Sequence, residues 1–114
     1  MLITEFLDKL STQPENIEFT DTMAVIELHY SFTDTSFVNG LQINAAGENS
    51  GSCKLFSFAQ LQNLNESKTL ACFGRYYRED VLDFPNAQDH QNIRQFMING
   101  WKGLHFESQA LNQK

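Results

Sequence analysis

Ten phenylalanines in a chain of 114 residues constrain the fold of this protein more than any other feature of its sequence. A fully buried Phe side chain stabilises the folded state by roughly 2–3 kcal/mol, so these rings can build a substantial core. A chain of this length forms one domain and is too short for two of ordinary size. We therefore expect a single globular domain over residues 1–114, without linkers or internal repeats.

Apolar residues recur at helical spacing through most of the chain. The expected helices cover residues 2–10, 23–30, 52–63 and 65–84, with a last helix from Asp89 to Gly100. Residues 23–30 also alternate as a strand would, but possible N-caps at residues 20–22 favour the helix. Asn65 is expected to cap the helix over residues 65–84, in which Gly74 would permit a close crossing. Asp89 is expected to cap the last helix, with Met97 facing inward.

Strand signals are fewer and shorter. Asn39-Gly40 lies within residues 36–43 and is typical of a two-residue type I′ hairpin turn. Residues 104–106 alternate apolar and polar side chains, which predicts a final strand that pairs with this hairpin. Residues 108–114 are polar and are expected to fray. The predicted fold class is α+β: a mainly helical small domain of about five helices with a small antiparallel sheet.

The charge balance excludes several classes of partner. The chain has 14 acidic and 8 basic side chains, a net charge of −6, and it has no basic run. Such a surface repels phosphate backbones, so we expect no nucleic-acid binding. No apolar run approaches the roughly 18 residues of a membrane span, and no signal peptide is recognisable. We therefore expect no membrane association and a cytoplasmic protein.

Cys53 is the first candidate for catalysis. If Ser50 or Ser52 caps the helix that follows, the Cys53 thiol lies in its first turn, where the partial positive charge favours the thiolate. His90 could then serve as the general base of a thiol-dependent hydrolase or transferase. The alternative is that Cys53 is a small buried side chain, and the frequency with which unpaired cysteines are buried favours this interpretation. Cys72 is expected to be buried as well.

The histidines and the two cysteines show no spacing typical of a metal site or a disulfide framework. We therefore expect no metal and no cofactor, with reduced thiols. His90 follows Asp89 at the expected start of the last helix, where a neutral imidazole could act as a base or a ligand. An exposed histidine in a helix cap is the simpler interpretation.

A basic pair stands out in this acidic chain. Arg75 and Arg78 are three residues apart and would share one helix face, where they could bind a carboxylate or a phosphate. Arg75 is also four residues before Glu79, and Arg78 stands among Glu79, Asp80 and Asp83, so local ion pairing explains both arginines without a ligand. Arg94 and Trp101 are further candidates for this surface. The loop over residues 39–52 could present backbone amides to an anion at the start of the following helix, although ordinary turn chemistry also explains it.

Five segments of the sequence resemble the HopJ type III effector family. They are residues 21–26, 37–40, 46–54, 69–82 and 89–94, in the same order and over nearly the whole chain. The resemblance implies a bacterial protein delivered into a host cell through a type III secretion system. It implies no reaction, and it assigns no catalytic or binding residues. Type III export relies on a flexible Ser-rich N-terminus, whereas residues 2–10 predict a helix of the fold, so we expect the bacterial cytoplasm as the location.

These observations predict a non-enzymatic binding or interaction domain, with the thiol enzyme built on Cys53 and His90 as the alternative. Its partner would be a host or bacterial protein or a small anionic ligand. The candidate binding residues are Arg75, Arg78, Glu79, His90, Arg94 and Trp101.

Overall fold

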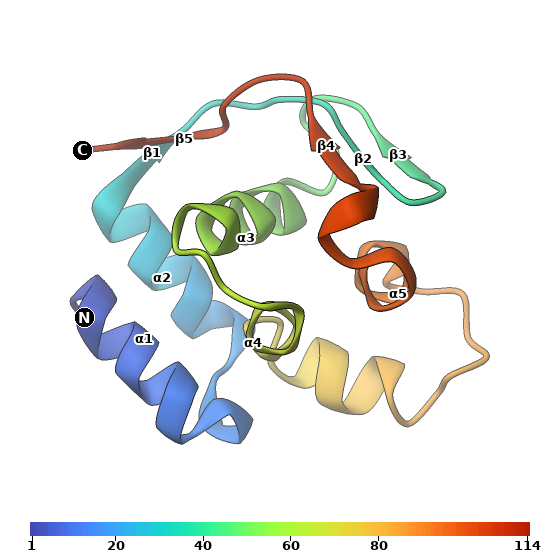
Figure 1. Cartoon of the computed structure of the whole chain (residues 1–114), viewed down its shortest axis with the longest axis horizontal. Helices are drawn as coiled ribbons and strands as arrows, with labels where there is room; N and C mark the ends of the chain where they lie inside the picture. Colours follow the sequence, from blue (N-terminus) through green and yellow to red (C-terminus); the bar gives the residue numbers. More distant parts are fainter.

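Five α-helices and a π-helical segment surround a common core, with two small antiparallel sheets along one side (Figure 1). The computed structural model describes residues 1–114. The α-helices are α1 (Ile3–Thr12), α2 (Phe19–His29), α3 (Ser50–Leu61), α4 (Glu66–Ala71) and α5 (Gln91–Asn99). The π-helical segment is η2 (Tyr76–Val81), and two 3-10 turns are η1 (Pro14–Asn16) and η3 (Gly100–Gly103). The strands are β1 (Tyr30–Phe32), β2 (Phe37–Asn39), β3 (Gln42–Asn44), β4 (Leu104–Phe106) and β5 (Leu111–Gln113).

The phenylalanines build the core around α3, which lies at the centre of the molecule (Figure 1). Six of the ten rings are buried: Phe6, Phe37, Phe56, Phe58, Phe73 and Phe96. Three more are partly buried and pack against that core, whereas Phe84 is 63% exposed. The prediction of a mainly helical α+β fold with a small antiparallel sheet is confirmed. None of the helices is both long enough and apolar enough to cross a membrane.

The three-stranded sheet has the order β3-β2-β4, so the predicted pairing of the final strand with the hairpin is confirmed. The hairpin turn lies one residue later than Asn39-Gly40, where the sequence predicts it. Asn39 pairs with Gln42 as part of the ladder, and the turn residues are Gly40 and Leu41. Gly40 has φ +59° and Leu41 has no positive φ, which fits a type II′ turn rather than type I′.

The expectation that residues 108–114 fray is wrong. Leu111 is buried, and β5 pairs antiparallel with β1 to form the second sheet. The two ends of the chain meet there, because His29 contacts the Met1 carbonyl and also accepts a backbone hydrogen bond from Lys114 through its own carbonyl oxygen. The last strand therefore ties the C-terminal segment to the end of α2.

The predicted helix over residues 65–84 is two separate segments. Asn65 caps α4 as expected, with its side-chain oxygen accepting from the Lys68 N–H, but α4 ends at Ala71. Gly74 then adopts φ +63°, and its Cα lies against the backbone where α2 begins. A side chain there would meet the Phe19 nitrogen at 2.7 Å, so the close approach inferred from Gly74 is real but interrupts the helix.

Three helix starts also differ from the prediction. Helix α2 begins at Phe19, four residues early, with the Asp21 carboxylate accepting from the Glu18 N–H. Helices α3 and α5 are preceded by Asn49 and His90 in the left-handed conformation, and neither has a side-chain cap. Asp89 does not cap α5, because its oxygens accept from Arg94 instead. Met97 was expected inside but is 43% exposed.

Candidate functional site

The starts of α2, α3 and α5 converge on a cavity of about 410 Å³. Its walls combine aromatic rings with neutral amide and hydroxyl side chains. The lining residues are Phe19, Gln42, Asn49, Gly51, Ser52, Phe73, Tyr76, Gln88, His90, Gln91, Asn92 and Ile93. We call this hollow the His90 cavity.

One wall of the His90 cavity is a row of four rings. Phe19 stacks on Phe73 at 6.2 Å between centroids, and its other neighbour Tyr76 meets it edge-on at 5.4 Å. The His90 ring continues the row, 5.2 Å from Tyr76. Such a row offers a flat or apolar group a contact surface of aromatic faces and edges.

The facing wall is formed by the first turns of α3 and α5. The N–H groups of residues 50–52 and of residues 91–92 have no hydrogen-bond acceptor in the folded chain. In each case a left-handed residue precedes a right-handed one, Asn49 before α3 and His90 before α5. Successive N–H groups in this arrangement form a concave nest that favours anions, and the helix dipoles act in the same direction. Because Gly51, Ser52, Gln91 and Asn92 line the cavity, its polar wall carries partial positive charge.

A cluster of asparagines, three of them buried, holds these two helix starts together. Asn44 and Asn92 exchange hydrogen bonds through their side-chain amides, at 2.9 and 3.2 Å. The same Asn44 oxygen accepts from the Asn49 amide at 2.7 Å, and Asn39 donates to the Asn92 carbonyl at 2.7 Å. The cluster therefore fixes the cavity's polar wall through strand β3. Sequence reasoning missed it, because asparagines are ordinary loop residues and these come from four separate segments.

His90 is held by two carboxylates outside the cavity lining. Its Nε2 lies 3.0 Å from Asp80 Oδ2 and 3.8 Å from Asp89 Oδ2. The imidazole is about one quarter exposed, so it can reach a ligand in the cavity while these carboxylates orient it.

Arg94, a predicted binding residue, is 90% buried and supports the loop that carries His90. It donates to the Asp89 carbonyl, to the Asp89 carboxylate at 2.7 Å and to the Phe84 carbonyl at 3.0 Å. The hydrogen bond from Arg94 lowers the pKa of Asp89 below its usual value. Arg94 therefore positions residues 84–90 rather than facing the cavity.

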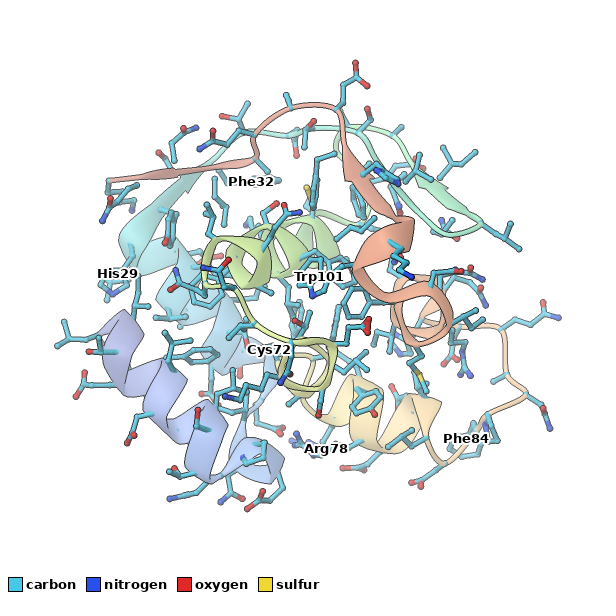
Figure 2. The ribbon with its side chains drawn as sticks, viewed as in Figure 1. His29, Phe32, Cys72, Arg78, Phe84 and Trp101 are labelled. Carbon is cyan, nitrogen blue, oxygen red and sulfur yellow. The ribbon has the colours of Figure 1, made fainter.

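The other predicted arginines lie together at a neighbouring place. Arg75 and Arg78 both bind the Glu18 carboxylate, and Arg78 also donates to the Ile17 carbonyl at 2.8 Å. Hydrogen bonds from Arg75, which has the larger effect, and from Arg78 lower the pKa of Glu18. Figure 2 shows Arg78 on the side of η2 that faces the start of α2. Arg75 and Glu79 line a second hollow of about 360 Å³, which shares the aromatic wall of the His90 cavity.

Trp101 lies apart from these residues. Its indole N–H donates to the Leu64 carbonyl at 3.1 Å, and its ring packs edge-on against Phe96 at 5.1 Å. The predicted binding residues therefore fall in separate places, and only His90 lines the first cavity.

Both thiols are buried. Cys53 is 1% exposed, its sulfur lies 4.0 Å from the Thr35 carbonyl oxygen, and burial is the main cause that raises its pKa. Burial also raises the pKa of Cys72 to about 12, and Figure 2 shows this residue in the middle of the molecule. The structure brings His90 but not Cys53 to the cavity wall. No three His, Cys, Asp or Glu side chains gather in a group that could hold a metal ion.

Comparisons with known proteins give a family and a matching fold. The family model described as "HopJ type III effector protein" matches residues 3–111. A crystal structure titled "Crystal structure of unknown function protein VPA0580" is 56% identical in sequence, with a TM-score of 0.98, and the match covers 100% of this chain and 95% of that one. No curated protein matches the sequence.

Proposed function

This chain belongs to the HopJ type III effector family, and we propose that it acts as a non-enzymatic binding domain for a small organic anion held in the His90 cavity. The observation that carries the proposal is the pairing of two walls. A row of aromatic rings and two uncapped helix starts line the same cavity, which has a volume of about 410 Å³. A cavity of this size suits a ligand of metabolite dimensions. The ligand would carry a carboxylate or phosphate on a flat or apolar body.

Each wall recognises one part of such a ligand. The unpaired N–H groups of residues 50–52 and 91–92 supply hydrogen bonds to the anionic oxygens at no cost in broken protein contacts. Phe19 and Tyr76 contact the apolar body. His90 lines the same cavity, where its ring can offer a further hydrogen bond to the ligand.

The chemistry of the thiols supports binding rather than catalysis. A nucleophilic cysteine needs an accessible sulfur and a stabilised thiolate. Cys53 has a buried sulfur and a raised pKa, which both oppose attack on a substrate. His90 instead meets the carboxylate of Asp80.

Backbone-detected NMR tests the proposal directly. Phenyl phosphate and benzoate are titrated into the ¹⁵N-labelled protein, with phenol and benzamide as neutral analogues of similar size. We expect the anions alone to shift the amide signals of residues 50–52 and 91–92. Equal shifts with the neutral analogues, or no shift at about 10 mM anion, would overturn the proposal.

A matched pair of charge variants sharpens this test. Gln91→Glu adds a carboxylate to the first turn of α5, where the helix dipole favours it, so the fold is retained while the anion is repelled. Gln113→Glu makes the same chemical change at an exposed position of β5, away from the cavity. We expect at least tenfold weaker phenyl phosphate binding for Gln91→Glu and wild-type binding for Gln113→Glu.

The name of the family also implies delivery of the protein into a host cell. Helix α1 contributes the buried side chains of Phe6 and Leu10 to the core, so export would require this part of the fold to open first. We propose the bacterial cytoplasm as the place where the folded domain acts. A reporter fused after residue 30 tests this, since its appearance outside the cell through a type III apparatus would contradict it.

A further inference from the structure

Five large apolar side chains are exposed on the side of the molecule formed by the hairpin tip, α5 and the end of η2. Each is between 43% and 88% exposed. They are Leu41, Leu82, Phe84, Met97 and Ile98, and we call them the apolar band. Phe84 is the one phenylalanine that does not join the core, and Figure 2 shows it beyond the end of η2, at the edge of the molecule.

Three members of the band line a common groove. It lies between the end of η2 and α5, has a volume of about 320 Å³, and is lined by Leu82, Met97 and Ile98 among others. Gln95 also lines this groove, and its side-chain oxygen accepts a hydrogen bond from the Leu41 N–H at 3.0 Å. The hairpin tip therefore stands next to the groove.

The area of the band lies at the upper end of what the surface of a monomer carries. With roughly 200 Å² for each large apolar residue, the exposed fractions correspond to an area on the order of 600 Å². The largest apolar patch of a typical monomer is about 300–600 Å², and a standard interface buries about 800 Å² on each partner. The band with its polar rim therefore approaches the size that one half of a small dimer needs.

We propose that the apolar band is a two-fold interface with a second copy of this chain. A two-fold interface uses the same surface on both partners, so that surface must carry both a projection and a recess. Leu41, at 88% exposure, is the projection, and the groove beside it is the recess. Across the two-fold axis, each Leu41 would enter the groove of the other copy.

The lining of the groove is also compatible with a second copy. Two chains of net charge −6 repel each other, so carboxylates at the contact would oppose dimerisation. No Asp or Glu lines the groove, and the exposed carboxylate of Asp83 lies between Leu82 and Phe84 outside its lining. Its one charged side chain, Arg94, is 90% buried and already paired with Asp89.

Sedimentation velocity over about 10 µM to 1 mM protein tests the proposal. An interface of this size is expected to be weak, with a dissociation constant on the order of 10–100 µM. We therefore expect the mass to rise from 13.1 kDa toward twice that value with concentration. A mass of 13.1 kDa throughout this range would overturn the proposal.

Charge variants on exposed positions locate the interface without threatening the fold. Ile98→Glu and Leu41→Glu place carboxylates on both halves of the band, and each is expected to raise the dissociation constant at least tenfold. Leu28→Glu makes the same change on α2, at a side chain that is 58% exposed outside the band, and should leave dimerisation unchanged. A dimer that resists both band variants, or that Leu28→Glu disrupts equally, would place the interface elsewhere and refute the inference.

Discussion

Replacing Gly74 with alanine tests the contact that interrupts the predicted helix and brings Phe19 to the cavity. Gly74 has φ +63°, a conformation that costs a residue with a Cβ about 1–2 kcal/mol. The added Cβ would also lie 2.7 Å from the Phe19 nitrogen and 2.8 Å from the Glu18 Cα. Both are backbone atoms at the start of α2, so they can yield only if the helix moves. Overpacking of this kind costs about 1–3 kcal/mol, and we expect a total loss of about 2–5 kcal/mol for Gly74→Ala.

Gly47→Ala is the matched control, because Gly47 has φ +91° but nothing lies within 4 Å of its added Cβ. This variant should lose only the conformational part, about 1–2 kcal/mol. Urea denaturation measures both losses, with the single tryptophan, Trp101, as a fluorescent probe because its ring packs against Phe96 in the core. If the two alanine variants lose the same stability, the contact between Gly74 and the start of α2 does not constrain the fold as argued.

Two further predictions concern titratable groups. Burial raises the pKa of Cys53, and it raises the pKa of Cys72 to about 12. At pH 8 iodoacetamide should therefore alkylate neither thiol in the folded chain and both thiols in urea, as measured by mass spectrometry. Fast labelling of Cys53 in the folded chain would contradict this. Pairing with arginine lowers the pKa of Glu18 and Asp89 in the folded state, so their contribution to stability is present above the ordinary carboxyl values of 4.5 and 3.8 and is lost as pH falls below them. For Asp89→Asn, the free energy of unfolding should therefore fall less between pH 5 and pH 2 than it does for the wild type. An equal fall would show that the pairing of Asp89 with Arg94 contributes nothing to stability.

The segments that the sequence predicted correctly are those whose signal is local. The periodicity of residues 2–10 and the apolar circumference of residues 52–63 describe α1 and α3, because a helix that packs on a core repeats its apolar side chains every three or four residues. The pattern also continues through residues 65–84, but there a contact with Glu18 and Phe19 decides the backbone of Gly74. Local periodicity cannot register a contact with a segment more than 50 residues earlier.

The same limit explains the missed strand and most of the site. In β5, the pairing of Asn112 with Ser31 joins residues that are 81 apart in the sequence. A strand of three residues, two of them polar, gives no strand signal of its own. His90 could be singled out because imidazole has distinctive chemistry at neutral pH. Asn44 and Asn92 could not, since their importance depends on a mutual contact across 48 residues.

The meeting of the two chain ends at His29 suggests a way to connect the same segments in a different order. Lys114 reaches the Glu27 carbonyl at 2.8 Å, and Met1 lies against the His29 ring at 3.0 Å. A short peptide could bridge these ends, and the exposed segment around residues 86–88 could be opened in exchange. In such a circular permutant the polypeptide would begin near α5 and end just after η2, while every sheet and the phenylalanine core would be rebuilt from the same pairs of neighbours.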